Sequence, residues 1–491
     1  MNQTVNMPLD VVIMAAGKGT RMKSALPKVL QRLGGKALLQ HVVETAAALK
    51  ARSVVVITGH QSVVVVNALN SMNHSLNAIN NIAEKAINTT ATDKNTPILT
   101  INNVLQEPQL GTGHAVQQAV PKLPDDGMVL VLSGDVPLTQ ADTLNALIAL
   151  ANSEKLALLT IDFANPSGYG RVIRNGEKVT AIVEQKDANE AQKLITEVYS
   201  GIMAVPAKLL KAWLARLDNK NAQSEYYLTG IVKFAVTDGL AVVAHKINDV
   251  AQVAGVNSPV QLAELEREYQ LRQAKALMEQ GVRLADPARF DLRGSLECGQ
   301  DVEIDINCIF SGQVSLGAGV RVGAHCVISN ARIADGAVIQ PFTHIEGEKQ
   351  GVSIGAGALV GPFARLRPGA VLGKDVHIGN FVEVKNATLA DGAKANHLAY
   401  LGDAAVGERV NFGAGSITAN YDGANKHLTV IEADVHVGSN CVLVAPVTIG
   451  AGGTVAGGST ITKSTPAGVL TVARGKQVSI TNWQRPKKIA K

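Results

Sequence analysis

The stretch that decides the fold runs from residue 354 to residue 385 and reads IGAGALVGPFARLRPGAVLGKDVHIGNFVEVK. Within it, an aliphatic residue returns at every sixth position, namely Ile354, Val360, Leu366, Leu372, Ile378 and Val384. This period is typical of a parallel β-helix, in which three hexads close one triangular coil and coils stack about 4.8 Å apart. We therefore predict a prism with these aliphatic side chains inside. The period returns at Val437, Leu443, Ile449, Val455 and Ile461.

Two positions break the rule that a small residue follows the aliphatic one. Arg367 follows Leu366, and Lys385 follows Val384. Because Lys385 comes three hexads after Arg367, both should lie at the same corner of successive coils, with backbones about 5 Å apart. Two cations at that distance repel by roughly 3 kcal/mol at an effective dielectric constant of 20, and by less than about 1 kcal/mol in water. The pair predicts either a phosphate clamp or long side chains that extend into solvent.

One histidine follows this pair. His397 comes 12 residues after Lys385 and close to Tyr400. A single histidine is usually a packed or surface imidazole, but an imidazole beside a phosphate clamp can take the proton of an attacking amine. His397 is therefore a candidate general base.

The first half of the chain has another pattern. Apolar runs at 11–15, 53–58 and 128–132 end in Gly, Asp or small residues, and segments such as 37–49 and 141–151 have helical spacing. This alternation predicts an α/β fold with its site beyond the carboxyl ends of parallel strands. The capping pair Ser258-Pro259 starts a predicted helix that stops at Gly281. We expect an α/β domain at 1–257, a connecting helix at 258–281 and a β-helix domain at 282–491.

Two predicted strands in the first half end in segments with charged side chains. The first apolar run continues into Ala16-Gly17-Lys18-Gly19-Thr20-Arg21-Met22, a glycine-bearing turn with cations that suits phosphates, followed by Lys28. The turn matches neither an ATPase P-loop nor a dinucleotide fingerprint. The run at 128–132 ends in Ser133-Gly134-Asp135, and a carboxylate there suits Mg²⁺ as well as it suits a helix cap.

Composition narrows the class of protein. The 491 residues include 46 Gly but only 2 Trp, 7 Tyr and 8 Phe, which agrees with a narrow prism that has little room for rings. A net charge of +5 is too small to indicate nucleic-acid binding, and no apolar run approaches the length of a membrane span. The first residues also lack the pattern of a signal peptide. We expect a cytoplasmic protein that binds neither nucleic acid nor membranes.

Three further expectations concern the second half and one insertion. The cysteines lack C-x-x-C spacing, which favours reduced thiols over disulfides or zinc; they are Cys298, Cys308, Cys326 and Cys441. A prism with flat outer faces buries little surface alone, so we expect self-association, most simply as a homotrimer. Residues 69–100 are rich in Asn and Thr and predict a mobile loop beside the sheet, to which we assign no function.

Four strings of the first half together resemble the sugar-nucleotide pyrophosphorylases. They are Met14 to Met22, Leu26-Pro27-Lys28, Gln109 to Gly113 and Gly134 to Pro137. Joined to hexapeptide repeats, they resemble the bacterial bifunctional N-acetylglucosamine-1-phosphate uridylyltransferase and glucosamine-1-phosphate acetyltransferase family, GlmU. The resemblance implies an α/β Rossmann-like nucleotidyltransferase domain, a connecting helix and a left-handed parallel β-helix of hexapeptide repeats.

The resemblance also implies which residues of the first half bind substrates. The turn from Met14 to Gly17 would hold the nucleotide, and Arg21 and Lys28 would bind the phosphates. The uracil would be bound by Gln106, Gly111 and Thr112. Asp135 and Asn257 would bind Mg²⁺. The full set implied for the nucleotide and sugar is Met14, Ala15, Ala16, Gly17, Arg21, Lys28, Gln106, Gly111, Thr112, Ser133, Gly134, Asp135, Gly170, Glu184 and Asn257. Where the family has an Asn-Thr-Gly string, this chain reads Tyr199-Ser200-Gly201.

For the second half, the resemblance makes His397 the base that deprotonates the amine of glucosamine 1-phosphate. The sugar phosphate would lie among Arg367, Lys385, Tyr400, Asn411, Asn420 and Tyr421. Acetyl-CoA would contact Ala414, Ser439, Gly457 and Arg474, where Gly457 stands in place of an expected Ala.

The implied function is therefore two reactions on one chain: acetyl transfer from acetyl-CoA to glucosamine 1-phosphate, then Mg²⁺-dependent uridylyl transfer from UTP. Two alternatives stay open. One is a nucleotidyltransferase of other specificity, whose β-helix serves assembly or regulation. The other is a trimeric scaffold that binds nucleotides without catalysis.

Overall fold

The computed structural model describes residues 7–73 and 99–486. The chain divides into two compact units, Met1–Tyr269 and Gln270–Lys491. The division falls inside helix α8 (Pro259–Glu279), the helix predicted at 258–281.

The first unit is built on a mixed sheet in the order β11-β7-β10-β6-β1-β4-β5, with a β8–β9 hairpin attached to β10. Its strands are β1 Leu9–Ala15, β4 Ser53–Thr58, β5 Thr100–Leu105, β6 Met128–Ser133, β7 Lys155–Asp162, β8 Gly170–Asn175, β9 Lys178–Val183, β10 Glu197–Pro206 and β11 Ala241–Ile247. A separate small hairpin joins β2 Arg32–Leu33 to β3 Lys36–Ala37.

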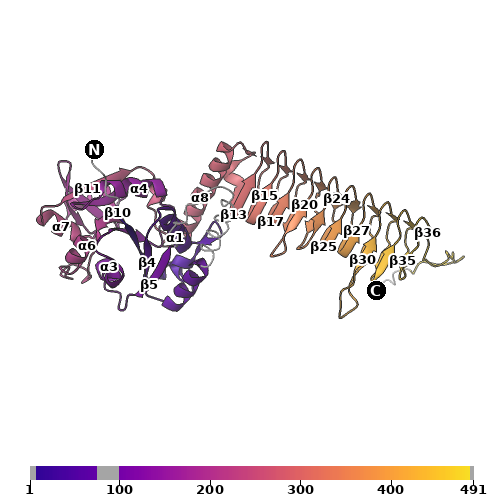
Figure 1. The fold of residues 1–491 in the computed structure, drawn as a ribbon, viewed down its shortest axis with the longest axis horizontal. Coiled ribbons are helices and arrows are strands. Elements are labelled where there is room, and N and C mark those ends of the chain that lie inside the picture. Colours follow the sequence, from indigo (N-terminus) through magenta and orange to yellow (C-terminus); the bar gives the residue numbers. More distant parts are fainter. Residues whose placement is uncertain (1–6, 74–98, 487–491) are drawn as a thin grey trace, which may run out of the picture. The chain divides into compact units, whose positions relative to one another are not determined.

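Helices cover both faces of this sheet (Figure 1). Helices α1 and α4 pack on one face, and α3, α6 and α7 pack on the other. Their bounds, with those of the short α5, are α1 Leu38–Ala48, α3 Thr112–Ala119, α4 Ala141–Leu150, α5 Glu190–Lys193, α6 Ala207–Leu214 and α7 Gly230–Thr237. Strand β1 is buried on both sides because Val11 and Ile13 enter one core and Val12 the other. The predicted α/β class is therefore confirmed.

The topology places the candidate site at one edge of the sheet. Strand β1 lies between β4 and β6 and is parallel to both, so the three carboxyl ends share that edge. The order reverses at β1, since β4 and β5 extend to one side and β6 to the other. Ligands bind at such a switch point in open α/β sheets.

The predicted loop at 69–100 is described only at its ends. Residues 69–73 are the last described turn of a helix, and Leu69 and Met72 are buried, so the loop prediction is wrong for these five positions. Residues 74–98 lie outside the described part, and β5 begins at Thr100.

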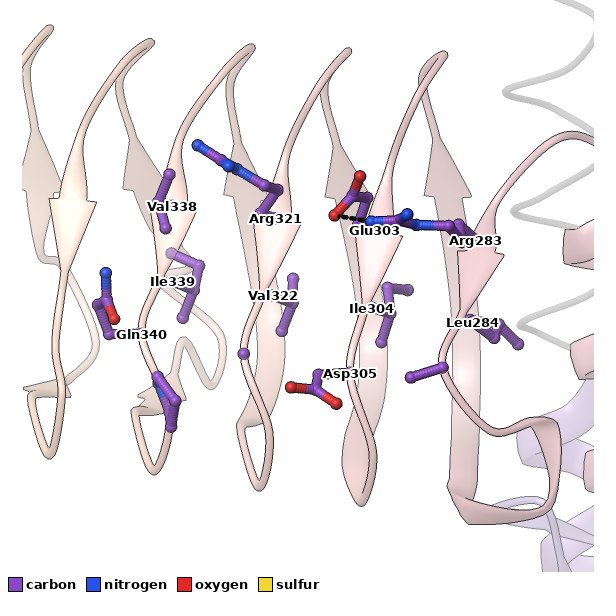
Figure 2. A pocket seen from close by; sticks show the side chains of 13 residues that line it. Arg283, Leu284, Glu303, Ile304, Asp305, Arg321, Val322, Val338, Ile339 and Gln340 are labelled. Atoms are coloured by element: carbon purple, nitrogen blue, oxygen red, sulfur yellow. Dashed lines mark ion pairs between the residues drawn. The ribbon is translucent and has the colours of Figure 1, made fainter.

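The second unit is a stack of parallel coils (Figure 1), which confirms the β-helix. All six aliphatic residues of the stretch 354–385 are buried, with at most 2% of their surface exposed. Figure 2 shows the repeat on the first coils: Leu284, Ile304, Val322 and Ile339 follow one another from coil to coil, beside a shallow pocket of about 510 Å³. The coils thus begin at β12, before the six-residue period is recognisable in the sequence.

The strands of the prism form two ladders. One contains β12 Arg283–Leu284, β14 Glu303–Ile304, β16 Arg321–Val322, β18 Val338–Ile339, β21 Leu359–Val360, β24 His377–Asn380, β26 Lys394–His397, β28 Asn411–Phe412, β31 His436–Val437, β34 Thr454–Val455 and β36 Leu470–Thr471. The other contains β13 Phe290–Cys298, β15 Cys308–Leu316, β17 Val327–Ile333, β19 His344–Glu346, β22 Arg365–Leu366, β25 Glu383–Leu389, β27 Tyr400–Val406, β29 Ile417–Ala419, β32 Val442–Val444 and β35 Thr460–Ile461, with β20 Val352–Ile354, β23 Val371–Leu372, β30 Thr429–Ile431 and β33 Val447–Ile449 on its third-face branches.

One outer corner of the prism carries stacked rings, and we call it the phenylalanine corner: His325, Phe342, Phe363, Phe381 and Leu398. The four rings stack in sequence with centroids 4.9, 5.0 and 5.3 Å apart. All five residues have φ between 50° and 61°, a left-handed conformation that is uncommon for large side chains. Because about half of each phenylalanine is exposed, the corner forms an apolar ridge.

The cysteines are free thiols, as predicted. Cys308, Cys326 and Cys441 are buried in the prism, and burial raises the pKa of Cys308 to about 11 and that of Cys326 to about 12. Such thiols are unreactive structural residues.

Candidate active sites

A cavity of about 310 Å³ lies at the shared carboxyl edge of β1 and β6. Ten of the residues implied for the nucleotide line it: Met14, Ala15, Ala16, Gly17, Lys28, Gln106, Gly111, Thr112, Ser133 and Asp135. They come from segments that are far apart in the sequence. The topology of the sheet therefore assembles the candidate nucleotide pocket.

Hydrogen bonds fix the walls of this pocket. The Gly134 amide donates to the Met14 carbonyl at 2.9 Å, which ties the loop after β6 to the end of β1. Buried Gln106 donates from Nε2 to the Gly111 carbonyl at 3.0 Å. Gly111 has φ of 107°, and a Cβ there would lie 2.7 Å from the Tyr226 carbonyl oxygen, so only glycine fits.

Three polar side chains converge at one end of the pocket. Lys28 Nζ lies 2.5 Å from Asp135 Oδ2 and 3.1 Å from Asn257 Oδ1, and the Lys28 and Asp135 side chains are less than one-fifth exposed. The Asp135 carboxylate and the Asn257 amide oxygen thus both face the ammonium group of Lys28. Both are hard donors of the kind that Mg²⁺ takes, together with phosphate oxygens and water. The donor set fits a divalent cation, although among residues 7–73 and 99–486 no group of three His, Cys, Asp or Glu side chains gathers.

Other residues implied for the first half lie outside this cavity's lining. Arg21 is exposed on a short 3-10 turn, Thr20–Met22. Gly170 and Glu184 lie on the β8–β9 hairpin and directly after it. Glu184 accepts a hydrogen bond from Thr229 Oγ1 at 2.9 Å, and burial raises the pKa of its carboxyl group.

In the second unit, Arg367 and Lys385 lie at the same corner of neighbouring coils. Their strands pair in register, and the Arg367 amide donates to the Val384 carbonyl at 2.9 Å. Both side chains line a cavity of about 800 Å³ that also contains Lys349 and Lys426. We call this place the cationic corner.

Charges within the cationic corner act on one another. Lys426, burial and Arg367, in that order, lower the pKa of Lys385. Arg367 donates to Glu383 Oε1 at 2.9 Å, and Glu348 and Asp403 also line the cavity, so carboxylates partly offset the positive charge. The arrangement of several cations around an open cavity can bind a phosphate.

Tyr400 belongs to the same corner. Gly402 is the register partner of Lys385 on the next coil, and a Cβ there would meet the Tyr400 hydroxyl. The missing side chain of Gly402 therefore makes room for the Tyr400 ring. Asn420, buried, donates to Asp403, which lines the same cavity. Tyr421 is exposed and donates to the Gly423 carbonyl at 2.6 Å.

His397 lies elsewhere, on the phenylalanine corner beside Leu398. It is exposed, its Nδ1 is 2.9 Å from Asn380 Oδ1, and it does not line the cavity of the cationic corner. The structure does not bring the candidate base to Arg367 and Lys385 within one chain. Asn411, on β28, is 3.2 Å from His436 and likewise does not line that cavity.

The residues implied for acetyl-CoA continue the column of His397. Main-chain hydrogen bonds join successive coils from Gly415 to His397, from Asn440 to Ala414 and from Gly458 to Ser439. Arg474 donates to the Gly457 carbonyl at 2.8 Å. One column along this corner, which we call the donor column, therefore contains His397, Ala414, Ser439, Gly457 and Arg474.

Comparison with known proteins agrees with this architecture. The family model of the MobA-like NTP transferase domain matches residues 11–178, and that of the bacterial transferase hexapeptide (six repeats) matches residues 351–386. Bifunctional protein GlmU of Albidiferax ferrireducens is 70% identical over 484 residues, covering 98% of this chain and 100% of the relative. The chain belongs to the GlmU family.

Further GlmU relatives match at similar length. The protein of Polaromonas sp. is 70% identical and covers 99% of both chains, and that of Herminiimonas arsenicoxydans is 52% identical over 483 residues. GlmU membership confirms the predicted resemblance, the fold class and the bifunctional transferase function. In the described part of the chain, no helix is both long and apolar enough to cross a bilayer.

Sequence reasoning missed several residues that line the two candidate sites. Gln109 and Glu225 line the candidate nucleotide pocket. Gln109 stood within a quoted motif, but Glu225 lies in a loop whose nearness to Gly111 the sequence does not indicate. Lys349 and Lys426 at the cationic corner come from excursions outside the six-residue period, so no spacing pointed to them.

Proposed function

We propose that the chain catalyses two consecutive steps of UDP-N-acetylglucosamine synthesis. The β-helix unit transfers acetyl from acetyl-CoA to glucosamine 1-phosphate, and the α/β unit transfers uridylyl from UTP to the product. The observation that carries the proposal is the assembly of ten implied residues in one pocket of a chain 70% identical to a GlmU protein. We place both steps in the cytoplasm, where UTP and acetyl-CoA are available.

In the uridylyl step, a phosphate oxygen of N-acetylglucosamine 1-phosphate attacks the α-phosphorus of UTP, and the bond to the pyrophosphate oxygen breaks. The attacking oxygen of the sugar phosphate is ionised near neutral pH. The step therefore needs orientation and charge stabilisation rather than a general base. Main-chain amides of the turn from Met14 to Gly17 hold the nucleotide. Lys28 and Arg21 offset the phosphate charge.

Mg²⁺ is the cofactor that we propose for this step. Asp135 and Asn257 would hold it, and when bound it would supply positive charge to the phosphates. Support comes from the two hard oxygen donors that converge on the Lys28 ammonium group. Lys28, once released from Asp135, would bind a phosphate of the substrate.

In the acetyl step, the amine nitrogen of glucosamine 1-phosphate attacks the thioester carbonyl of acetyl-CoA. A C–N bond forms, the C–S bond breaks and coenzyme A leaves, while His397 accepts the amine proton. Arg367 and Lys385 bind the sugar phosphate, with Tyr400, Asn411, Asn420 and Tyr421 around it. The donor column holds acetyl-CoA.

The separation of the cationic corner from the donor column supports self-association, which we propose takes the form of a homotrimer. Acceptor and base lie at different corners of one prism, so an acceptor site of one copy must meet the donor column of another. The exposed ridge of the phenylalanine corner runs along the coils that precede the donor column. A second copy that covers this ridge would bring the two half-sites together.

The deciding experiment is incubation of the full chain with glucosamine 1-phosphate, acetyl-CoA, UTP and Mg²⁺, with detection of UDP-N-acetylglucosamine. Omission of acetyl-CoA should stop the sequence, and N-acetylglucosamine 1-phosphate should restore it. Uridylyl transfer without acetyl transfer would favour a nucleotidyltransferase with a structural β-helix. Absence of both activities would favour a nucleotide-binding scaffold.

A further inference from the structure

Asn380 and His397 occupy equivalent positions on successive coils of the prism. Asn380 ends β24 and His397 ends β26, and the two residues are register partners. The Leu398 amide donates to the Asn380 carbonyl at 3.0 Å, so a main-chain hydrogen bond holds the two strand ends together. The side chains also meet, since His397 Nδ1 lies 2.9 Å from Asn380 Oδ1. The asparagine of one coil therefore holds the imidazole of the next.

The close approach of these two coils depends on the residue before Asn380. A Cβ on Gly379 would overlap the Asn396 carbonyl oxygen, so a larger residue would push the two strand ends apart. The residues directly after the pair, Phe381 and Leu398, have φ of 56° and 50°. Both coils thus turn the same left-handed corner, which keeps the two side chains of the pair side by side.

The corner itself does not require a polar residue at the position of Asn380. On nearby coils, the residue before the left-handed corner is Ala324, Pro341, Pro362 or Ala414. Each of those coils turns the corner with an apolar side chain in this place. The polar group of Asn380 is therefore available to act on the neighbouring imidazole.

The contact decides which nitrogen of His397 can act as a base. An amide oxygen has no proton to donate, so Nδ1 carries the proton and donates it to Asn380 Oδ1. A neutral imidazole has only one N–H group, so Nε2 then has a free electron pair. Because Nδ1 faces the preceding coil, Nε2 points away from Asn380. Without this acceptor, the proton could lie on either nitrogen and the ring could rotate.

We propose that Asn380 is a positioning residue for acetyl transfer. Its Oδ1 keeps the proton of His397 on Nδ1, so Nε2 is free to accept the proton of the attacking amine. As the C–N bond forms and the C–S bond breaks, that proton moves to Nε2, and the imidazolium keeps its hydrogen bond to Asn380. This bond is stronger to the charged ring than to the neutral one, so it stabilises the transition state. The inference rests on the proposed acetyl transfer and names the residue that orients its base.

Asn380→Leu removes the acceptor and leaves a side chain of similar size, apolar like those on nearby coils. With glucosamine 1-phosphate and acetyl-CoA, we expect kcat of acetyl transfer to fall about tenfold or more, the effect of one lost charge-assisted hydrogen bond. KM for both substrates should not change, because Asn380 binds neither of them. Sedimentation velocity should show the wild-type assembly, and uridylyl transfer should be normal.

Asn380→Asp keeps the acceptor but adds a negative charge. The carboxylate oxygens can still accept from Nδ1, so kcat at alkaline pH should lie well above that of Asn380→Leu. The charge also favours the imidazolium, so the acidic limb of the kcat profile should move to higher pH. A purely structural role for Asn380 would not move that limb. This variant decides alone if Asn380→Leu fails to assemble.

Asn307→Asp is the matched control. Asn307 Nδ2 lies 3.4 Å from His325 Nε2, so this variant also places a carboxylate beside a histidine of the prism, but not beside the candidate base. Its acidic limb should be that of the wild type. A wild-type kcat for Asn380→Leu, or an unmoved limb for Asn380→Asp, would overturn the inference. A wild-type chain without acetyl transfer would instead overturn the proposed function.

Discussion

Phe363→Asp is the sharpest test of how the acetyl-transfer site is completed. Phe363 is the middle ring of the three phenylalanines, with centroids of its neighbours 5.0 and 5.3 Å away. Its φ is 55°, a conformation that Asp adopts more readily than Phe. The substitution should therefore leave the single coil intact and act on whatever covers the ridge.

The expected loss of association free energy follows from the exposed fractions of the three phenylalanines. Phe342, Phe363 and Phe381 are 50%, 46% and 57% exposed. At about 200 Å² per ring side chain, they present roughly 300 Å² of apolar surface. Covering that surface contributes about 7.5 kcal/mol per chain at 25 cal/mol/Å², of which Phe363 supplies roughly 2 kcal/mol. A carboxylate buried there without a partner costs several kcal/mol more, so association should weaken by a factor of about 10³ or more.

The assay measures the oligomeric state by sedimentation velocity and both activities on the same sample. We expect Phe363→Asp to dissociate the assembly and to lose acetyl transfer in proportion, while uridylyl transfer continues and reports a folded chain. Phe363→Tyr, which keeps the ring, should stay assembled. An intact oligomer with normal acetyl transfer for Phe363→Asp would refute the reasoning.

Three other predictions concern single side chains. Asp135→Ala should lower pyrophosphate release at least 10²-fold and leave acetyl transfer unchanged, and normal release would remove Asp135 from the metal site. His397→Ala should lower acetyl transfer 10²- to 10⁴-fold with normal uridylyl transfer, and a normal acetylation rate would exclude it as the base. Lys426→Met removes the largest cause that lowers the pKa of Lys385, so that pKa should rise. The alkaline limb of acetyl-transfer kcat/KM should then move to higher pH, and an unmoved limb would contradict the role of Lys385.

The six-residue period predicted the prism well because each coil repeats one local rule. The same count places Lys385 one coil beyond Arg367, and the register agrees. The same count also predicts that His397 lies away from Arg367 and Lys385, because 12 residues are two hexads and two hexads end at another corner. The expectation that a base lies beside a phosphate clamp had instead favoured one shared site.

Other features were beyond sequence reasoning for a physical reason. Glu225 reaches the nucleotide pocket because the carbonyl oxygen of its neighbour Tyr226 packs against Gly111, a contact between distant segments. Lys426 reaches the cationic corner from an excursion that interrupts the period. Tyr199 is visible in sequence as a departure from the family string, but only the structure pairs it with Gly170 on the neighbouring strand and places its ring in a hydrophobic core.

The hydrogen-bonded stacking of coils has a consequence for how such a chain can change over evolution. Each coil is joined to the next by the same kind of main-chain hydrogen bond. For example, the Arg367 amide donates to the Val384 carbonyl, and the Tyr400 amide donates to the Ser416 carbonyl. Insertion or deletion of a whole coil would lengthen or shorten the prism without rotating any corner. Gain or loss of a single residue would turn every later side chain to a different direction, so selection should tolerate length changes here mainly in whole coils or in the outward excursions.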